Sequence, residues 1–329
     1  MQKRKLIILA SIFLLLGNLT VVAQDAHFSQ FFANPLYLNP AFAGSNVCPR
    51  VAAHFRDQWP SLAGNYITYT ASYDQHFDKL AGGIGVLFLG DRAGGGTINT
   101  YNISIMYSYK LKVSRKFNMR FALQASYQQK SLNWSKLTFG DMIDPKYGFV
   151  YETNEQQPSK TSKGCVDFAA GFIGYTDKIY FGFAAHHFTR PYEGFTSISR
   201  LPVKWTGHFG AYFDLKRKSR KERSFGDISI SPNIIYQQQM KFHQLKMGLY
   251  LNFYPFVVGF WYRECFSNPD AFIVMFGIQH DISRVAYSYD ITLSRLSNLS
   301  GGSHEVSLQF LFRCPEKVRV IKDLNCPTF

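Results

Sequence analysis

The sequence contains little that suggests catalysis, metal binding or a helical membrane anchor. After Leu16, no apolar run approaches the roughly 18 residues that a membrane-spanning helix needs. It has no Cys-x-x-Cys pair, no close cluster of Cys and His, and no His-Glu-x-x-His spacing, which argues against a zinc site. Acidic residues are few, 22 against 36 basic ones. The five cysteines are an odd number, so they cannot all pair within one chain.

The first 23 residues have the pattern of a cleaved secretory signal: residues 3–5 are basic, residues 6–16 form a short apolar core, and small residues precede Gln24. An uncleaved anchor is the alternative. Without residues 3–5, the 36 basic residues fall to 33 against 22 acidic ones, an excess of 11. In an exported chain, this charge favours anionic lipid, lipopolysaccharide or a wall polymer as partner over nucleic acid.

Aromatic residues are abundant, with 31 Phe and 20 Tyr, and they make up 17% of the chain. An exported chain that is rich in Phe and Tyr but lacks membrane helices is typical of a transmembrane β-barrel. Residues 100–109 alternate as a barrel strand does. The odd positions are Tyr101, Ile103, Ile105, Tyr107 and Tyr109, while the even positions are mostly polar.

The same alternation recurs in enough segments for an all-β transmembrane barrel of about 14 antiparallel strands. A soluble β-sandwich is the alternative, but it would not need so many outward Tyr and Phe side chains. The predicted strands cover residues 50–57, 65–77, 81–90, 97–111, 118–132, 164–175, 178–189, 202–215, 226–238, 243–253, 256–263, 271–280, 284–294 and 304–313.

The ends of the chain lie outside this pattern. We expect a barrel over residues 50–313, preceded by a segment at 24–49 and followed by a short periplasmic tail at 314–329. With the N-terminus in the periplasm, long connections face outward and short ones face the periplasm, the usual asymmetry of such barrels. The long connections are 133–163, 190–201 and 295–303, and the short ones are 176–177, 254–255 and 281–283.

The segment before the first strand contains "FSQFFANPLYLNPAFAG", residues 28–44. It is too apolar for an ordinary flexible terminus, and its two prolines exclude a helix or a central strand. Its Asn-Pro steps suit tight turns. We predict a plug or brace that enters the lumen from the periplasmic side and is formed by Phe28, Phe31, Phe32, Pro35, Tyr37, Pro40 and Phe42.

Several charged residues occupy the inward register of their strands. An Arg or Lys that faced lipid near the midplane would cost roughly 2–4 kcal/mol, so these side chains are expected in the lumen. They either form a solvated salt-bridge network across the pore or hold the N-terminal segment in place. The candidates are Asp74, Arg120, Lys204, Lys246, Asp290 and Glu305, with His208 on the same register.

Eight stretches together resemble the PorP/SprF family of outer-membrane proteins of the type IX secretion system. They are "HFSQFFANPLYLNPAFAGS", "RDQWPSL", "YTASYD", "FLGDRAGGG", "WSKLTFGDMID", "WYR", "YSYD" and "GGSHEVSL", and they span residues 27–308. The resemblance implies a non-enzymatic barrel related in architecture to the FadL fatty-acid transporters. It also implies a role in secretion or surface anchoring of large adhesins, in gliding motility, and contacts with periplasmic peptidoglycan-associated lipoproteins. The family offers no catalytic residues to transfer.

Four smaller features have ordinary explanations beside functional ones. The glycines at 82–85 and 94–96 lack the strand, spacing and helix of a phosphate loop, and close strand packing explains them. His186 and His187 are adjacent on a strand, so one ring should point outward and one inward, without sharing a metal. The segment 134–164 is either a surface contact for a secreted adhesin or a lid. Cys314 and Cys326 bracket a short tail that a disulfide would close, or they are free thiols.

A basic run, "KRKSRKER", falls on a predicted periplasmic turn. It could contact inner-leaflet phosphates or a periplasmic partner, or it could be a solvated charged turn. Its basic residues are Lys216, Arg217, Lys218, Arg220, Lys221 and Arg223.

These patterns lead to one functional hypothesis and one alternative. The first is an outer-membrane barrel of a diderm bacterium that needs no cofactor and serves a secretion machine as partner or anchor for a surface protein. The alternative is a FadL-like channel for small hydrophobic molecules. An apolar lumen would favour transport, whereas a lumen occupied by the protein's own N-terminus would favour the secretion role.

Overall fold

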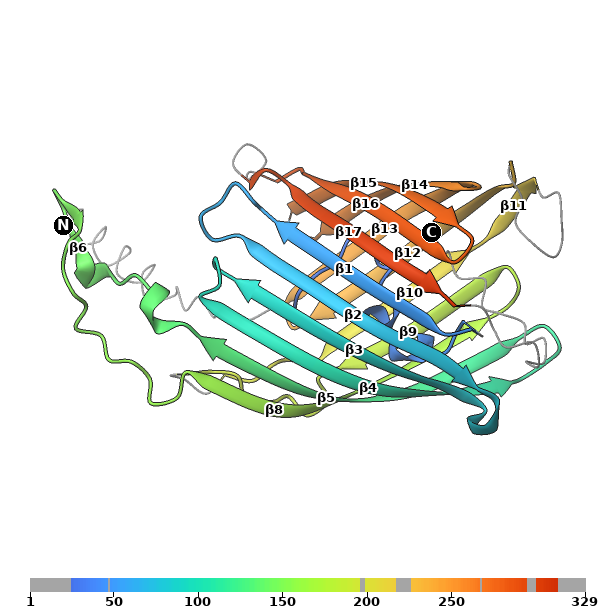
Figure 1. Ribbon diagram of the computed structural model, residues 1–329, viewed down its shortest axis with the longest axis horizontal. Helices are drawn as coiled ribbons and strands as arrows, with labels where there is room; N and C mark the ends of the chain where they lie inside the picture. Colours follow the sequence, from blue (N-terminus) through green and yellow to red (C-terminus); the bar gives the residue numbers. More distant parts are fainter. Residues whose placement is uncertain are drawn as a thin grey trace, which may run out of the picture.

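The computed structural model describes residues 25–46, 48–195, 199–216, 226–266, 268–294 and 300–312. In this part of the chain, consecutive strands pair antiparallel around a closed ring (Figure 1). The first strand pairs with the last, β1 with β17, and the pairing of β10 with β12 completes the circuit. β10 and β11 are two pieces of one strand, so the described barrel has fourteen strands.

The strand bounds follow the predicted ranges closely, and all fourteen predicted strands are present. The elements of the ring are β1 (Arg50–Gln58), β2 (Tyr66–Phe77), β3 (Gly82–Ala93), β4 (Ile98–Lys112), β5 (Asn118–Leu132), β8 (Ser162–Tyr175), β9 (Ile179–His186), β10 (Lys204–Ala211), β11 (Phe213–Lys216), β12 (Ile228–Gln239), β13 (Phe242–Phe253), β14 (Phe256–Cys265), β15 (Asn268–His280), β16 (Ser283–Thr292) and β17 (Ser303–Leu311).

Two predicted strands differ from the observed ones for local reasons. The strand expected at 178–189 ends at His186, because His187 adopts a left-handed conformation with φ of 63°. The strand expected at 202–215 is interrupted at Tyr212, whose backbone N–H donates to the Lys178 carbonyl at 2.7 Å. The barrel wall is therefore irregular between β9 and β11.

The alternation that predicted the strands is the alternation of burial. On β4, Tyr101, Ile103 and Ile105 are exposed on the outer surface, whereas Ser104 and Met106 are buried inside. The outer face is therefore apolar and aromatic, as lipid contact requires, and the inner face carries the polar residues. In the described ranges, no helix is long and apolar enough to cross a membrane.

The longest connections lie at one end of the barrel. This end, here called the long-loop end, carries the connections at 133–161, 187–203 and 293–302. The opposite short-turn end carries those at 176–178, 254–255 and 281–282. The six connections named from the sequence thus lie at the expected ends, although the long-loop end also carries the two-residue turn at 240–241.

The longest connection projects away from the barrel rather than covering its mouth (Figure 1). It contains the two-residue strands β6 (Ile143–Asp144) and β7 (Gly148–Phe149), which pair as a small hairpin. Tyr147, Phe149 and Tyr151 on this hairpin are well exposed. The lid alternative is therefore not the arrangement seen here.

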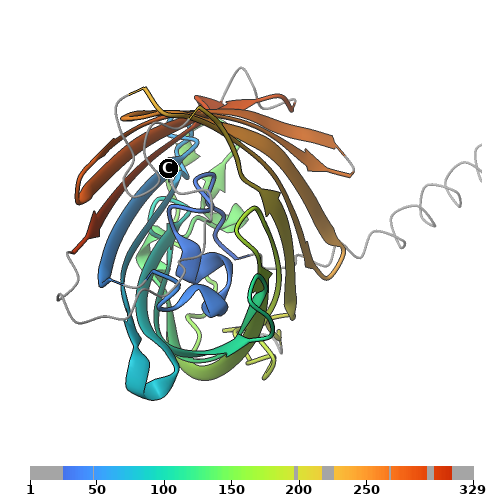
Figure 2. The same ribbon diagram turned by 90° about the vertical axis from the view of Figure 1, so that its right-hand side faces the viewer.

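The segment that precedes β1 lies inside the ring, as the view along the barrel shows (Figure 2). Two one-turn helices form there, α2 (Pro35–Leu38) and the 3-10 helix η1 (Pro40–Phe42). The expectation that the two prolines exclude a helix was wrong for helices of a single turn. Each proline occupies the first helical position, where its missing N–H costs nothing. The Asn39 side chain caps η1 by accepting from the Ala41 N–H at 2.9 Å.

Some predicted features lie outside the described residues. They include the signal at 1–23, most of the basic run after Lys216, and the tail with Cys314 and Cys326. Lys216 itself is exposed at the end of β11. Cys48 is disulfide-bonded and Cys165 and Cys265 are free.

Candidate functional site

The N-terminal segment runs through the lumen from one end of the barrel to the other. Asp25 lies at the long-loop end, where its carboxylate accepts from His187 at 2.9 Å and lies 3.3 Å from the Lys204 ammonium. Gly44 lies at the short-turn end, where its N–H donates to Asp74 at 2.9 Å. The sequence predicted entry from the periplasmic side only, whereas the structure shows the segment spanning the lumen.

Near the long-loop end, Ser29 is held by a buried cluster of charges. Arg56 from β1 contacts Asp290 at 2.9 Å and Glu305 at 3.0 Å. Glu305 accepts the backbone N–H groups of Ser29 at 2.7 Å and Gln30 at 3.0 Å. All of these groups are nearly inaccessible to solvent. Charges this deeply buried are tolerated because each has a charged partner and additional hydrogen bonds.

Arg263 from β14 extends this cluster across the lumen. Its guanidinium lies 3.0 Å from Asp290 and 3.2 Å from the Ser29 hydroxyl, and it also bonds Asp270. The Ser29 hydroxyl in turn donates to Asp290 at 2.6 Å. A single small side chain of the segment is therefore bonded to three strands of the wall.

At the short-turn end, a second charged cluster holds the end of the segment. Arg50 binds Asp74 through two nitrogens, at 2.8 and 3.0 Å, a bidentate geometry that gives strong, oriented bonding. Arg120 donates to the backbone carbonyls of Ala43 at 3.1 Å and Gly44 at 2.7 Å. The chain is thus fixed by its backbone just before it enters β1.

Gly44 and Gly83 allow this close approach. Gly44 has φ of +60°, and a Cβ built on Gly83 would lie 2.5 Å from both the Gly44 Cα and the Ala43 carbonyl oxygen. No side chain fits there unless the segment moves. The glycine cluster at 82–85 is explained by packing, as expected, and its partner is the N-terminal segment.

Between the two charged clusters, the segment is held by aromatic packing. Phe31 and Phe32 contact Trp261, with ring centroids 5.0 and 6.2 Å apart, and Phe42 stacks on His208 at 5.4 Å. Burial of one such side chain contributes about 1.5–3 kcal/mol. Every predicted plug residue is buried except Tyr37, which is half-buried.

The two predicted lysines also face the segment. Lys204 donates to the Tyr37 hydroxyl at 3.4 Å and lies beside Asp25. Lys246 donates to Gln237 at 2.6 Å, and its ammonium lies 4.4 Å from the centre of the Phe31 ring. The Lys246 nitrogen thus lies over an aromatic face, and among the described residues no carboxylate forms an ion pair with it.

All six predicted lumen residues therefore contact the N-terminal segment or the side chains that touch it. Sequence reasoning missed their partners Arg50, Arg56, Arg263 and Asp25. The signal was present for the first two, because Arg50 and Arg56 occupy the same register of β1 as buried Ala52 and His54. The register of a strand shows which face a residue occupies, but not which distant part of the chain its side chain contacts.

The prediction for the adjacent histidines was wrong. The left-handed backbone at His187 turns its ring back to the lumen, where it bonds both Asp25 at 2.9 Å and Asp167 at 2.7 Å. His186 and His187 consequently line the same pocket. No group of His, Cys, Asp or Glu in the described residues is arranged to hold a metal ion.

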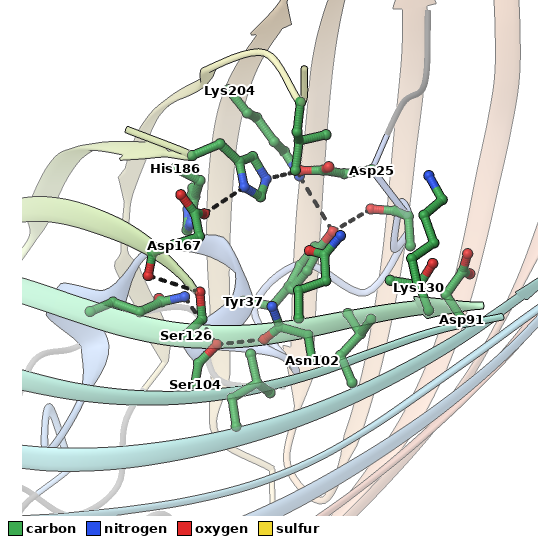
Figure 3. A pocket seen from close by; sticks show the side chains of 18 of the residues that line it. Asp25, Tyr37, Asp91, Asn102, Ser104, Ser126, Lys130, Asp167, His186 and Lys204 are labelled. Atoms are coloured by element: carbon green, nitrogen blue, oxygen red, sulfur yellow. Dashed lines mark hydrogen bonds and ion pairs between the residues drawn. The ribbon is translucent and has the colours of Figure 1, made fainter. Parts of the chain in front are cut away.

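Beside the N-terminal segment, part of the lumen remains open as a pocket, here called the chamber (Figure 3). It has about 840 Å³ of space, some of it open to solvent. One wall is the N-terminal segment with Asp25 and Tyr37, and the others come from β3, β4, β5, β8, β9 and β10. The chamber belongs to the long-loop half of the barrel, since it includes the ends of β3 and β5 at Asp91 and Lys130.

We expect the double variant Asp74→Asn with Asp290→Asn to raise ion conductance in planar bilayers. The first change removes the acceptor of the Gly44 N–H, and the second removes a carboxylate bound to Arg56 and Ser29. Both ends of the segment are then less firmly held. Asp141→Asn in the projecting connection is the matched control. Conductance equal to that of the unaltered protein would contradict a retaining role for these carboxylates.

Several solved structures of bacterial proteins are similar to this chain. The toluene transporter TbuX of Ralstonia pickettii is 9% identical, with 84% of this chain and 93% of that chain covered and a TM-score of 0.48. Omp33 of Acinetobacter baumannii is 10% identical, with 82% and 100% covered and a TM-score of 0.45. A FadL homologue of Pseudomonas aeruginosa is 11% identical, with 84% and 93% covered and a TM-score of 0.43. No curated protein sequence matches the chain significantly.

The family comparison is more specific. The model for "Type IX secretion system membrane protein PorP/SprF" matches residues 20–310, which include every strand of the barrel up to Phe310 and the whole lumen segment. Several stretches that first suggested this family supply the lumen contacts described above, among them "YTASYD", "WYR", "YSYD" and "GGSHEVSL", whereas "WSKLTFGDMID" lies in the longest connection. The chain belongs to the PorP/SprF family of type IX secretion system membrane proteins.

Proposed function

We propose that this protein is a non-enzymatic partner of the type IX secretion machine that supports secretion or surface anchoring of a large adhesin-type client. In gliding cells this role would extend to motility. Its family is a membrane component of that machine, and its fold places it in the outer membrane. The single observation that carries the proposal is a lumen that the protein's own buried segment spans from one end to the other. A barrel occupied in this way is suited to binding and positioning.

The projecting hairpin is the proposed contact for the client. With the long-loop end outside the cell, this hairpin would extend beyond the membrane. Its turn is ordered by Asp144, which accepts the backbone N–H groups of Lys146 at 2.7 Å and Tyr147 at 2.9 Å. The exposed aromatic rings beside it have no packing partner in the barrel and offer area for protein contact.

At the short-turn end, we propose a periplasmic contact. Lys216 begins the basic run, and a positive surface there suits a lipoprotein or a peptidoglycan-associated component of the machine, or the phosphates of the inner leaflet. Contacts with a client outside the cell and with a partner in the periplasm would explain a barrel that serves one machine although its own segment occupies the lumen.

Affinity purification in mild detergent, followed by mass spectrometry, tests this proposal. The unaltered protein should retain a large secreted adhesin, and the triple variant Tyr147→Ser, Phe149→Ser and Tyr151→Ser should lose most of it, because the exposed aromatic contact area is removed. Glu155→Gln in the same loop is the control and should retain the client. If the unaltered protein retains no secreted protein, the secretion role is refuted.

A second candidate function is a channel for small hydrophobic molecules. The favouring observation is the group of leucines along the chamber, Leu36, Leu87, Leu89 and Leu201. Transport would require the N-terminal segment to move, because it fills the lumen below the chamber. Uptake of a labelled apolar compound by cells with and without the protein distinguishes this function from client binding.

A further inference from the structure

The chamber carries charged and polar groups that neither client binding nor apolar transport uses. Its residues on β3, β4 and β5 lie in three layers set by the strand pairing. Asp91 pairs with Thr100 and Thr100 with Lys130 in the outermost layer. Below it, the second layer holds Leu89, Asn102 and Gln128, and the third holds Leu87, Ser104 and Ser126.

The strand that carries Asp91 presents a carboxylate above two leucines. Asp91, Leu89 and Leu87 are alternate residues of β3, so all three point into the lumen. At about 3.3 Å per residue, Leu87 lies roughly 13 Å from Asp91 along the strand. Leu87 and Leu89 are buried, whereas Asp91 is half-buried near the open side of the chamber. A charged group therefore stands at the entrance of an apolar strip.

The strip faces a wall of neutral hydrogen-bonding groups. Asn102 accepts from Ser104 at 2.7 Å, and Gln124 donates to Ser104 at 3.1 Å. The Gln124 carbonyl oxygen is buried and has no partner. The unpaired group at this wall is thus a hydrogen-bond acceptor, so a molecule bound in the chamber would need a donor to satisfy it.

Most of the other charges of the chamber are already paired. Lys130 binds Glu193 at 2.9 Å, and His187 lies between Asp25 and Asp167 while Lys204 lies beside Asp25. With His187 protonated, the cations Lys130, Lys204 and His187 balance the carboxylates of Asp25, Asp167 and Glu193.

Asp91 is the exception. It accepts one hydrogen bond, from the Thr68 hydroxyl at 2.6 Å, and no Lys, Arg or His of the described residues forms an ion pair with it. Because the paired groups cancel, the chamber keeps one uncompensated negative charge at the top of the apolar strip.

We propose that the chamber binds a primary amine at the end of an aliphatic chain. The ammonium group binds Asp91, and the chain lies along Leu89 and Leu87, opposite the amide groups of β4 and β5. Two sources share this chemistry: the side chain of a lysine in a peptide, and a free alkylamine. The site does not depend on the secretion role, since it uses only residues of this barrel.

Isothermal titration calorimetry of the full chain in detergent micelles tests the proposal. Three probes are titrated: n-hexylamine, 1-hexanol, and a tetrapeptide with blocked ends that contains one lysine. We expect hexylamine to bind and 1-hexanol, which lacks the charge, to bind at least about tenfold more weakly, because a charged hydrogen bond contributes more than a neutral one. Binding of the peptide as well would identify a lysine side chain as an acceptable source.

Variants decide whether Asp91 is the group involved. Asp91→Asn should weaken hexylamine binding by about tenfold or more, Asp91→Glu should retain it, and Asp141→Asn in the projecting connection should leave it unchanged. Folding of each variant is checked by its shift in gel mobility on heating. The proposal is overturned if hexylamine does not bind, if hexanol binds equally well, or if Asp91→Asn binds hexylamine as the unaltered protein does.

Discussion

Deleting residues 28–39 should open the barrel to ions. These residues supply Phe28, Phe31 and Phe32 to the lumen together with the backbone groups that bind Glu305. Without them, the space that they fill becomes continuous with the chamber, and water enters. In planar bilayers we expect conductance to rise by at least about tenfold, because a barrel of this size has an aqueous interior unless side chains fill it.

The same deletion should also lower heat stability. It removes several buried aromatic contacts at about 1.5–3 kcal/mol each, although water that enters the lumen will solvate the exposed charges. The measurement is the temperature at which the barrel loses its compact gel mobility. A deletion of equal length in the projecting hairpin is the control and should leave both readings unchanged. If the lumen deletion changes neither conductance nor stability, the segment is no plug, and docking of a partner becomes its better interpretation.

Arg56→Leu is expected to be the most destabilising single substitution in the lumen. Among the described residues, Arg56 is the one side chain that contacts Asp290, Glu305 and Ser29 together. Its loss leaves Glu305 without an ion-pair partner among the described residues. Removal of one partner of a buried ion pair costs about 3–5 kcal/mol. Urea unfolding of the refolded barrel, followed by tryptophan fluorescence, would measure the change in the free energy of unfolding.

A second variant separates the charge effect from simple loss of packing. In the double variant Arg56→Leu with Glu305→Gln, a neutral amide replaces the carboxylate that would otherwise be left unpaired. A substantial part of the free energy of unfolding should therefore return. Arg115→Leu in the exposed turn after β4 is the control and should change the free energy by less than about 0.5 kcal/mol. Equal destabilisation of the single and double variants would show that the buried charge is not the cause.

The barrel itself could be predicted because lipid and lumen impose opposite demands on alternate residues. On β4, the exposed Ile103 and the buried Ser104 follow directly from their positions in the period of two. The same rule selected Asp74, Asp290 and Glu305 as lumen residues. Each of these predictions depends only on local order along one strand.

The features that the sequence did not predict depend on contacts between residues that are far apart in the chain. Ser29 and Glu305 are separated by 276 positions, and no local pattern relates them. The chamber is likewise formed where strands, a loop and the N-terminal segment come together. The turn of His187 into the lumen depends on one left-handed residue, which the alternation of β9 does not reveal.

The path of the N-terminal segment dictates an order of assembly. Asp25 and Gly44 are fixed at opposite ends of a lumen that is closed by the seam between β1 and β17. The seam cannot form before the chain as far as β17 is available. Threading of the segment after closure would have to carry its phenylalanine rings past the buried charged side chains of the lumen. We therefore expect the wall to close around a segment that is already in place during insertion into the membrane.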